Sequence, residues 1–581
     1  MGIENFKVDR IIETEVLVIG GGGAAVRAAV AAFDSGAETI VVLKGQLGCS
    51  GATVSPDSPG VAWQLADNCS TAEDSPEAHF RNIVDVGLGM ADPRLARILA
   101  YELLARTEEL ENWGLKFVLD PKGKKPHYTG YSCFADQPRA HCILNSGNGH
   151  AGDVVQVLVD QIRARDIEVH ENTFVTDLLV QNNLCVGALA LGPEGEILVY
   201  RAGAVILGSG GARQIFPQET GRTLIDTTGD GYAMALRAGA ELTNMEFTQY
   251  MLHPIAPFPV KVPGVFWALV PKLKNRLGED ALAPYLPSGI NQTQVMVERT
   301  LHYPFSSRDC SKWLDIAFAN EIRAGRGSDE GGLYLDFSNI NLRAYKPSRP
   351  QHIPEDYDCP VDLPGSLVQV RPVAHAINGG LRINEQAEST LTGLFAIGEA
   401  AAGPHGADRL GGGMVPGSQV FGARAGKYAA MRVKGSGLST LAPETLAQPL
   451  ALMQSFNRGK REANQVLSAL QAATGTHLIV LRNELGLEAL IARIRELTET
   501  LLPQVPASSV SSLRQAIEVK NSLLTAELMA RAALIRRESR GSHYREDYPN
   551  QDDENWRFNI IFRQTQGQLR EEMDSLENAT G

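Results

Sequence analysis

The stretch EVLVIGGGGAAVRAA, residues Glu15–Ala29, decides the fold of this chain. It reads as a short buried strand, a turn of four glycines and the start of a helix. Gly20, Gly22 and Ala25 match the pattern G-x-G-x-x-G/A in the strand–turn–helix order that the pattern requires. The glycines allow a tight turn, and they let backbone N–H groups approach a pyrophosphate at the start of the helix, which we expect from Ala24 onward. The stretch therefore predicts an α/β, Rossmann-like domain that binds a dinucleotide.

The second predicted strand lacks one element of this pattern. An acidic residue commonly ends that strand, about 20 residues after the glycine turn, and holds the ribose of the dinucleotide. Here the strand TIVVLKG, residues Thr39–Gly45, ends in Leu43 and Lys44. Either backbone groups and other loops hold the ribose, or the ribose is held loosely.

Two later stretches repeat the combination of a buried strand and a glycine turn. They are GAVILGSGGARQIF, residues Gly203–Phe216, and TGLFAIGEAAAGPHGADRLGGGM, residues Thr392–Met414, with Glu399 just past the strand. Three such junctions predict one sheet that is assembled from distant segments, with large insertions between them. A dinucleotide that lies along the strand ends would contact all three junctions.

The composition excludes several classes of protein. The 581 residues are 44% hydrophobic and 21% charged, which is typical of a globular protein with roughly three or four structural units. A net charge of −13 argues against a nucleic-acid surface, which needs clustered basic residues. No apolar run reaches the roughly 18 residues that a membrane-spanning helix needs, and the N-terminus lacks the features of a signal peptide. We expect a cytoplasmic protein that binds no nucleic acid and meets a membrane only through a partner.

The seven cysteines are scattered along the chain, and no two of them form a Cys-x-x-Cys pair. This pattern argues against a disulfide framework, a zinc site or an iron–sulfur cluster in this chain, and we predict no metal site. If electrons pass through iron–sulfur centres, a separate partner protein must carry those centres.

Five stretches resemble, in the right order, motifs of one family: the flavoproteins related to the flavin subunits of succinate dehydrogenase and fumarate reductase. L-Aspartate oxidase and the flavin subunit of adenylylsulfate reductase belong to the same family. The stretches are TTGDGYAMALRAGAELTNMEFTQY (Thr227–Tyr250), SSRDCSKWLDIAFANEIRAGRG (Ser306–Gly327), PVAHAINGGLRIN (Pro372–Asn384), PHGADRLGGG (Pro404–Gly413) and ESRGSHYREDYPNQDDENW (Glu538–Trp556). The resemblance covers most of the chain and implies that the dinucleotide is FAD.

The resemblance also implies how the chain is divided. We expect the first part of a Rossmann-like FAD-binding domain over residues 1–245, an inserted capping domain over 246–365, the second part of the FAD-binding domain over 366–440, and a C-terminal helical domain over 441–581. Apolar residues recur every three or four positions in NELGLEALIARIRELTETLL, residues Asn483–Leu502, as expected for a helix. A cap of this kind buries the substrate when it closes.

Two arginines are implied to act on the substrate. By resemblance, Arg409 in PHGADRLGGG binds a substrate carboxylate above the flavin. A planar, permanently charged guanidinium suits two-point binding of a carboxylate, and the glycines let the loop approach a flat ring. The alternative is a structural arginine that is paired with a neighbour such as Asp408. Arg308, within Ser-Ser-Arg-Asp, corresponds to the arginine that delivers a proton to the substrate carbon.

Three histidines accompany these arginines. His375, in PVAHAINGG, corresponds to a histidine that holds the substrate carboxylate. His253, which precedes Pro254, corresponds to the histidine of the family's Gln-Phe-His-Pro motif, although QYMLHP has two extra residues here. The alternative for both is a histidine that only satisfies hydrogen bonds in the core. His405 either lines the flavin or stabilises its own loop.

The glycine turns and the resemblance together assign the FAD contacts. They are Gly20, Gly22, Gly23, Ala25, Lys44, Ser50, Gly51, Ala52, Gly210, Gly211, Asp230, Glu399 and Gly412. Many members of the family attach FAD to a histidine in a segment that corresponds to LGCSGATVSPDSPG, residues Leu47–Gly60, which contains no histidine. We therefore expect non-covalent FAD, with a lower flavin potential that favours substrate reduction or oxidase chemistry.

The capping domain departs from the family in one place. Fumarate reductases and succinate dehydrogenases carry a Thr-Glu pair and an Arg-Gly-Glu-Gly-like run before the catalytic arginine. The corresponding stretch, VKVPGVFWALVPKLKNRLGEDAL (Val260–Leu282), contains neither, and Val265, Phe266 and Trp267 stand where polar groups are expected. The pocket is then more apolar on that side, or it opens to a larger substrate.

Together these observations predict an FAD-dependent oxidoreductase. It would transfer a hydride between flavin N5 and a small carboxylic acid of the fumarate or succinate type, as a flavin subunit with an iron–sulfur or other electron-transfer partner. Arg409, His375 and His253 would meet the charge that develops on the carboxylate. Three alternatives stay open: an L-aspartate oxidase-like enzyme, a flavin subunit like that of adenylylsulfate reductase with a sulfur substrate, and a flavin-binding subunit without turnover that serves in assembly. The retained arginines argue against the last of these, and the oligomeric state stays open.

Overall fold

The computed structural model describes residues 7–49, 51–54, 62–67, 74–117, 127–130, 135–143, 152–217, 227–256, 267, 269–302, 304–338, 367–456 and 460–575, together with the single residues 119, 123 and 125. Three residues singled out above, Ser50, Val265 and Phe266, lie outside the described residues. Among the described residues, no helix combines the length and the apolar character that are needed to cross a membrane.

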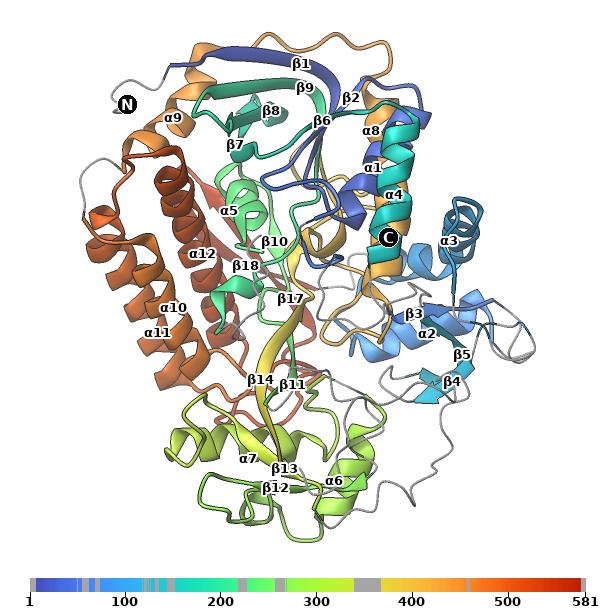
Figure 1. Ribbon diagram of the computed structural model, residues 1–581, viewed down its shortest axis with the longest axis vertical. Coiled ribbons are helices and arrows are strands. Elements are labelled where there is room, and N and C mark those ends of the chain that lie inside the picture. Colours follow the sequence, from blue (N-terminus) through green and yellow to red (C-terminus); the bar gives the residue numbers. More distant parts are fainter. Residues whose placement is uncertain are drawn as a thin grey trace.

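A seven-stranded sheet forms the centre of the nucleotide-binding part of the chain (Figure 1). Its strands are β1 (Arg10–Ile19), β2 (Thr39–Val42), β6 (Glu168–His170), β7 (Phe174–Gln181), β8 (Leu184–Leu191), β9 (Ile197–Leu207) and β16 (Leu394–Ala396). Their order is β6-β2-β1-β9-β8-β7, and β16 pairs with β9 outside this path. The strands β1, β2, β6, β9 and β16 are parallel, whereas β7 and β8 add an antiparallel extension. The sheet confirms the predicted α/β fold, which distant segments of the chain assemble.

The three predicted strand–glycine junctions end at one level of this sheet. The register places Ile19 of β1 beside Leu207 of β9, and Leu207 beside Ala396 of β16. Because parallel strands end at the same edge, the glycine turns that follow them lie together. The last residues of β1 are buried, as expected for a parallel sheet that is covered on both faces.

Helices α1 (Gly23–Asp34), α4 (Gly152–Ala164) and α8 (Met414–Val433) lie side by side next to this sheet (Figure 1). Small residues allow α1 and α8 to approach closely, since a Cβ on Gly426 would lie 2.3 Å from the carbonyl oxygen of Ala28. Further elements beside this layer are α2 (Pro76–Val86), α3 (Pro93–Asn112) and a small sheet of β3 (Ala62–Leu65), β4 (His127–Gly130) and β5 (Ala135–Ile143).

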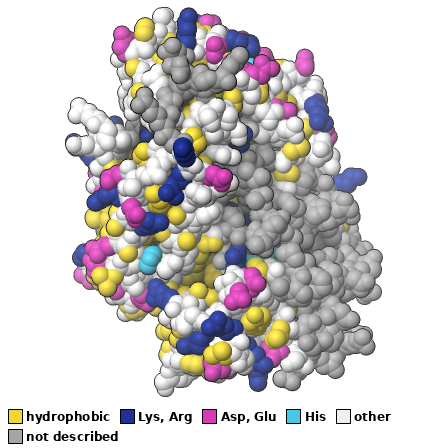
Figure 2. Space-filling view, turned by 60° about the vertical axis from the view of Figure 1, so that its left-hand side comes forward, with side chains coloured by type: hydrophobic (Ala, Val, Ile, Leu, Met, Phe, Trp, Pro, Cys, Tyr) yellow, Lys and Arg dark blue, Asp and Glu magenta, His cyan; other side chains and the backbone are white. Residues whose placement is uncertain are grey.

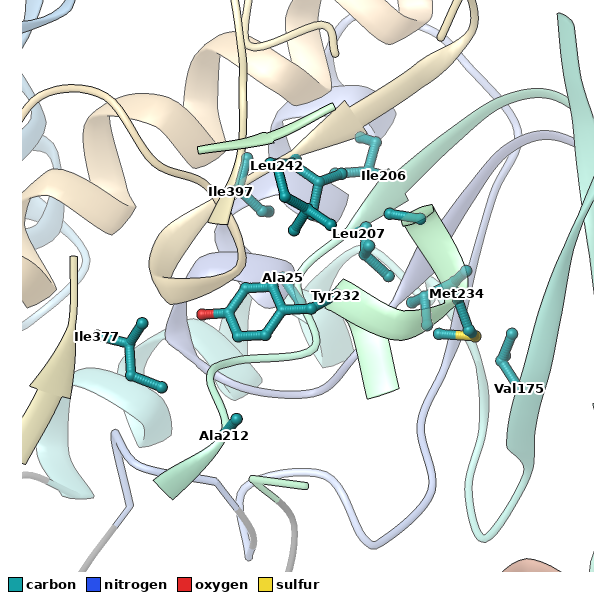
Figure 3. Packing of buried hydrophobic residues seen from close by; sticks show 14 of the residues in the cluster. Ala25, Val175, Ile206, Leu207, Ala212, Tyr232, Met234, Leu242, Ile377 and Ile397 are labelled. Carbon is teal, nitrogen blue, oxygen red and sulfur yellow. The ribbon is translucent and has the colours of Figure 1, made fainter. Parts of the chain in front are cut away.

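The main core joins the sheet to the helix α5 (Asp230–Arg237). Figure 3 shows Leu207 of β9 near Tyr232 of α5, and both side chains are fully buried. The hydroxyl group of Tyr232 nevertheless has a partner, because it donates a hydrogen bond to the backbone carbonyl of Glu399. The core therefore fixes the backbone of the third glycine junction.

Residues between 252 and 370 build a second hydrophobic core, where the sequence predicts the capping domain. It contains α6 (Gln292–Arg299), α7 (Lys312–Arg323) and strands of the sheet β11-β14-β13-β12. These strands are β11 (Thr248–Ala256), β12 (Lys272–Lys274), β13 (Leu333–Asp336) and β14 (Leu367–Ile377). The antiparallel pair β11 and β14 connects the two cores, since Tyr250 packs in the first and Leu252 in the second. Trp267 is buried in the second core.

The C-terminal region is helical, as predicted. After α9 (Ala447–Gln454), the helices α10 (Ala463–His477), α11 (Glu484–Glu496) and α12 (Val510–Ile535) pack together at one side of the molecule (Figure 1). A reciprocal capping box of Ser509 and Ser512 begins α12. The chain then ends in a hairpin that the sequence did not predict, β17 (Phe558–Thr565) and β18 (Gln568–Ser575). This hairpin joins a sheet with β10 (Leu242–Thr243) and β15 (Gly380–Leu381).

Acidic and basic side chains are intermixed over the described part of the face in Figure 2. Neither sign gathers into one continuous patch there.

Candidate active site

The three glycine junctions surround a cavity of about 320 Å³. Its wall includes residues 20–24 after β1, residues 208–210 after β9 and residues 397–399 after β16. Side chains from β11, β14 and the Arg409 loop complete the wall. The sequence prediction that all three junctions would face one ligand therefore agrees with the geometry.

The start of α1 suits a pyrophosphate group. No side chain caps this helix and its first turn holds no acidic residue, so its first N–H groups remain available at the cavity wall. Gly20 needs to be glycine, because its φ is 122° and a Cβ would lie 2.3 Å from the carbonyl oxygen of Gly208. Ala25 does not line the cavity; it packs against Gly208, where a Cβ would lie 2.9 Å from its methyl group. The residues present at this end fit a dinucleotide such as FAD.

Lys44 stands where a ribose-binding carboxylate was expected, and it is held by three side chains. Its Nζ donates to Thr228 Oγ1 at 2.8 Å, to Asp230 Oδ2 at 2.9 Å and to Glu518 Oε1 at 3.0 Å. Burial lowers the pKa of Lys44, but the two carboxylates outweigh burial and raise the pKa above its ordinary value. Asn521 donates to the other oxygen of Asp230 at 2.8 Å. Both Lys44 and Asp230 line the cavity.

Glu518 and Asn521 belong to α12. A C-terminal helix therefore supplies hydrogen-bond partners for Lys44 and Asp230 of the cavity wall. Sequence reasoning missed Glu518 and Asn521, because nothing local marks a polar residue on a long helix as part of a distant site. Only the three-dimensional structure could have pointed to these two residues, because the buried carboxylate of Asp230 needs a hydrogen-bond partner for each of its two oxygens.

The remaining predicted FAD contacts divide into three groups. Gly51, Ala52, Gly210, Glu399 and Gly412 line the cavity, whereas Ser50 lies outside the described residues. Gly211 lies behind the wall, where a Cβ would be 2.5 Å from the carboxyl carbon of Glu399. Burial raises the pKa of Glu399, although its Oε1 accepts a hydrogen bond from the N–H of Ile377 at 2.9 Å.

Arg409 is buried at the cavity wall, with 5% of its surface exposed. Its Nε donates to Gln249 Oε1 at 3.1 Å, its Nη1 to the carbonyl of Leu410 at 3.1 Å, and its Nη2 lies 3.4 Å from Nε2 of His375. The predicted alternative, a direct pair with Asp408, does not occur, because Asp408 Oδ2 bonds to Arg308 instead. Burial lowers the pKa of Arg409 to about 10, so the guanidinium stays charged at neutral pH.

The two histidines of β11 and β14 also line the cavity. His253 lies on the same face of β11 as Met251 and Gln249, because side chains alternate along a strand. Despite the two extra residues in QYMLHP, the structure thus places His253 on the cavity wall. The Nδ1 atom of His253 lies 2.9 Å from the carbonyl of Pro254. His375 is located at a bulge of β14, opposite Gln249 and Tyr250.

Arg308 does not line the cavity. Its Nη2 donates to the carbonyl of Val86 at 2.8 Å and to Asp408 Oδ2 at 3.2 Å, and its side chain is 24% exposed. Arg308 is thus bonded to the residue that directly precedes Arg409 in its loop. Burial raises the pKa of Asp408, which also accepts a hydrogen bond from Ser306 at 2.7 Å.

Two further predicted positions lie away from the wall. Burial, followed by the charge of Arg409, lowers the pKa of His405 to about 3, so this histidine is neutral in its loop. Trp267 packs into the core of the cap and does not line the cavity. The structure describes no other residue of the apolar triplet 265–267.

Sequence reasoning also missed Arg213, which lines the cavity on the turn after β9. Its Nε donates to the carbonyl of Ala374 at 2.9 Å, next to His375. An arginine on a glycine turn after a buried strand was the signal that singled out Arg409, and the same signal applies to Arg213. Gln249 was missed as well, since a single glutamine in a strand carries no such signal.

Comparison with known proteins agrees with this geometry. The sequence model of the "FAD binding domain" family matches residues 15–415, and that of "Fumarate reductase flavoprotein C-term" matches residues 468–578. One subunit of the fumarate reductase (CoM/CoB) from Methanothermobacter marburgensis is 33% identical, over 95% of this chain and 97% of that protein. The fumarate reductase flavoprotein subunit of Mycobacterium tuberculosis is 29% identical, over 96% of each chain.

Solved structures share the fold over the whole chain. Mycobacterium smegmatis Sdh1 in complex with UQ1 superposes with a TM-score of 0.81 at 27% identity, over 97% of this chain and 95% of that one. Adenylylsulfate reductase from Archaeoglobus fulgidus shares the fold, with a TM-score of 0.73 at 21% identity, over 99% of this chain and 97% of that one. The chain belongs to the family of FAD-dependent oxidoreductases that contains the fumarate reductase and succinate dehydrogenase flavoproteins, with L-aspartate oxidase as a relative.

Proposed function

We propose that this enzyme transfers a hydride between N5 of non-covalently bound FAD and a small carboxylic acid of the fumarate or succinate type. It acts as a flavin subunit that exchanges electrons with a separate partner. The observation that carries this proposal is Arg409, a buried cation at the cavity wall whose hydrogen bonds all go to uncharged groups among the described residues.

The hydrogen bonds of Arg409 leave part of its guanidinium for a ligand. The group has five N–H bonds. One from each nitrogen is directed to Gln249, to the carbonyl of Leu410 or to His375. One N–H on each terminal nitrogen remains, which is the arrangement that binds both oxygens of a carboxylate. Such a fork is already oriented before the substrate arrives, and it is shielded from water.

The protonation of His375 follows from its contact with Arg409. Because a guanidinium can only donate, Nε2 of His375 accepts and its proton lies on Nδ1. Bound FAD supplies the hydride chemistry, while Arg409, His375 and His253 hold the carboxylate and stabilise charge that develops on it. The proposed proton donor, Arg308, is carried by the cap, which would have to bring it to the substrate.

Non-covalent FAD is supported by the absence of histidine from residues 47–60. We predict that acid precipitation separates the cofactor from the protein, because no bond to the chain has to be broken. The yellow chromophore should appear in the supernatant, and the protein band on a denaturing gel should show no flavin fluorescence. A fluorescent protein band would contradict the proposal.

The need for an electron-transfer partner rests on the cysteines and on a relative. Among the described residues, no group of His, Cys, Asp or Glu is arranged to hold a metal ion. The relative from Methanothermobacter marburgensis is itself named as one subunit of its enzyme, which suits a chain that works beside another protein. We propose that the partner carries the iron–sulfur or other one-electron centres.

An anaerobic titration with fumarate tests the proposed function. The flavin is first bleached with dithionite, and its absorbance is followed as fumarate is added. We expect the oxidised band to return, because the enzyme passes a hydride to the double bond. Succinate, which has no double bond to reduce, is the matched control and should leave the flavin bleached.

Two outcomes would contradict the proposal in different ways. If fumarate leaves the flavin bleached, the acid is not of this type, and sulfur substrates become the next class to test. If the reduced flavin reacts with oxygen as fast as with fumarate, the enzyme behaves like an L-aspartate oxidase and needs no partner.

A further inference from the structure

The segment after α12 contains a family motif, Glu538–Trp556, that the proposed reaction leaves unexplained. Within it, the N–H of Arg540 donates to the carbonyl of His543 at 2.8 Å, and the N–H of His543 donates to the carbonyl of Arg540 at 2.9 Å. Gly541 and Ser542 therefore form the tip of a two-residue hairpin turn. Gly541 has a φ of 53°, a left-handed conformation that glycine adopts without strain.

One side of the Gly541–Ser542 turn contacts the cap. The N–H of Ser307 donates to the carbonyl of Gly541 at 2.7 Å. Ser307 directly precedes Arg308, the arginine that we propose as proton donor. The backbone that carries this arginine is thus attached to the turn.

The other side of the turn contacts the Arg409 loop. The N–H and the hydroxyl of Ser542 both donate to the carbonyl of Ala407, at 3.2 and 2.9 Å. Ala407 lies two residues before Arg409. A Cβ on Gly541 would lie 2.7 Å from the same carbonyl oxygen, so the turn and the loop are in direct contact.

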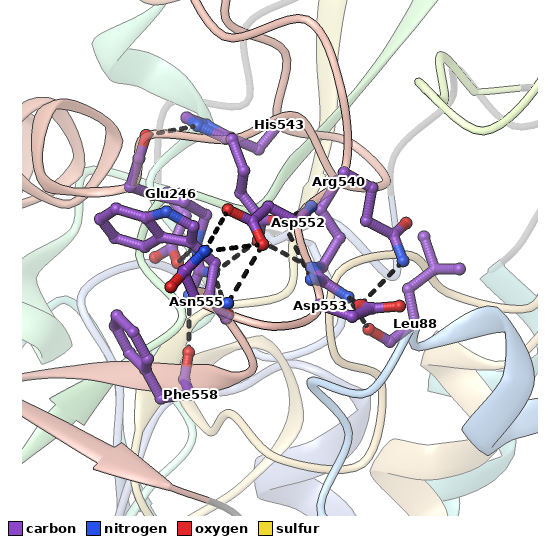
Figure 4. A network of polar contacts seen from close by, with 12 residues as sticks. Leu88, Glu246, Arg540, His543, Asp552, Asp553, Asn555 and Phe558 are labelled. Carbon is purple, nitrogen blue, oxygen red and sulfur yellow. Dashed lines mark hydrogen bonds and ion pairs between the residues drawn. The ribbon is translucent and has the colours of Figure 1, made fainter.

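Buried ion pairs hold the turn in place (Figure 4). Arg540 donates to both oxygens of Glu538, at 2.7 and 2.9 Å, to Asp553 at 2.7 Å and to the carbonyl of Leu88 at 2.6 Å. Glu538 is fully buried and Arg540 is 1% exposed. A buried ion pair with this many hydrogen bonds allows few other side-chain positions. The pair of Arg540 and Glu538 is therefore suited to hold the backbone of the Gly541–Ser542 turn in one position.

His543 contributes a neutral hydrogen-bond acceptor to the same framework. Burial and the nearby charges of Arg482, Arg536 and Arg545 lower its pKa well below the ordinary value. Its Nδ1 can therefore accept a hydrogen bond from Arg482 at 2.6 Å. Arg482 also donates to the hydroxyl of Tyr250 on β11, so the framework extends to the strand that carries His253.

We propose that the Gly541–Ser542 turn is a positioning element that sets Arg409 and Arg308 relative to each other. It contacts no substrate and acts through the backbone of the two loops. The proposal rests on the proposed function, because it assigns both arginines to one reaction. The C-terminal region then contributes to catalysis by positioning these arginines, beyond its contribution to folding.

The test compares Ser542→Ala with Ser539→Ala. Both serines are buried, and each hydroxyl donates to a backbone carbonyl, that of Ala407 for Ser542 and that of Tyr548 for Ser539. The hydroxyl of Ser539 also accepts a hydrogen bond from the N–H of Arg545 at 2.9 Å, so Ser539→Ala should lose at least as much stability as Ser542→Ala, but only Ser542 bonds to the Arg409 loop. We expect Ser542→Ala to lower kcat/KM for fumarate about fivefold to tenfold, the value of one hydrogen bond. Both a higher KM and a lower kcat should contribute, with unchanged FAD content.

A second variant displaces the loop itself. Gly541→Ala places a methyl group against the carbonyl of Ala407, and we expect kcat/KM to fall roughly 100-fold, because small displacements of catalytic groups are costly. Ser539→Ala should leave kcat and KM unchanged and lower only the melting temperature. If all three variants lose stability but keep wild-type kinetics, or if Ser539→Ala and Ser542→Ala lose activity equally, the turn is structural and the proposal is wrong. If the wild-type enzyme reduces no unsaturated acid, the proposed function itself fails and the positioning role falls with it.

Discussion

Arg409→Lys should raise the KM for fumarate roughly 100-fold while changing kcat much less, which corresponds to the loss of charge-assisted hydrogen bonds. The guanidinium of Arg409 satisfies Gln249, Leu410 and His375 and still offers two N–H groups. An ammonium group has three N–H bonds in total, so it cannot serve the same neighbours and a carboxylate together. Steady-state kinetics with fumarate measure the effect. Arg409→Met, which also removes the charge, should lower kcat/KM by roughly 1000-fold or more.

The pH dependence of KM in Arg409→Lys provides a second, independent test of the role of Arg409. Burial lowers the pKa of Arg409 only to about 10, so the wild-type KM should stay flat through neutral pH. Lysine starts from a lower ordinary pKa of about 10.4, and the same burial should bring it toward the neutral range. The KM of Arg409→Lys should therefore rise further as the pH rises above about 8, because the ammonium group loses its proton.

Arg165→Lys provides the matched control. The fork of Arg165 also holds a carboxylate, with Nε and Nη2 bonded to Asp34 at 2.6 and 3.0 Å, but it lies outside the cavity. Its replacement should leave the kinetics and the pH profile unchanged. Wild-type kinetics for Arg409→Lys would place Arg409 outside the substrate site and remove the main support for the proposed function.

The sequence predicted the position of those parts of the cavity wall that backbone geometry dictates locally. A glycine turn between a buried strand and a helix has few structural solutions, so the stretches around Gly20, Gly210 and Glu399 could be placed in one sheet before the fold was known. The register of β1, β9 and β16 then brings them together. Arg409 and His375 were singled out by resemblance to family motifs, and the structure places both on the cavity wall.

The parts that the sequence did not reveal depend on docking between distant segments. Glu518 and Asn521 act at the cavity only because α12 packs beside α5. Gln249 gains its role from the alternation of β11, which turns it toward Arg409. The motif of Arg308 suggests a place in the pocket, and its role stays a prediction, because the structure directs its side chain to Asp408 and not to the cavity wall.

Arg308→Ala should abolish turnover, with a loss of kcat of roughly 1000-fold or more, while FAD stays bound. The proposed reaction needs a proton donor opposite the flavin, and Arg308 is the cap residue assigned to this role. The same substitution has a structural consequence, because it leaves the fully buried carboxylate of Asp408 without its cation. Removing one partner of a fully buried pair typically costs about 3–5 kcal/mol, and the cost here should lie below that range because the side chain of Arg308 is 24% exposed. A loss of activity in the single variant therefore has two explanations.

The pH dependence of stability identifies the structural part. Burial already raises the pKa of Asp408 above its ordinary value, and the loss of Arg308 should raise it further. A carboxyl group whose pKa is raised in the folded state favours folding when protonated, and this contribution is lost as the pH rises through the folded pKa. Arg308→Ala should therefore lose stability, relative to the wild-type protein, as the pH increases from about 4. Melting temperatures across this range measure the effect.

The double variant Arg308→Ala/Asp408→Asn separates the two explanations. An amide at position 408 carries no charge, so the double variant should regain the stability that the single variant loses and should not lose it again as the pH rises. If Arg308 donates the proton, turnover stays abolished in this stable protein, because the carboxamide replaces the partner and not the arginine. If Arg308 serves only as the counter-ion of Asp408, the double variant regains turnover. Single-turnover oxidation of the reduced flavin by fumarate distinguishes these results, since it reports the chemical step without the electron-transfer partner.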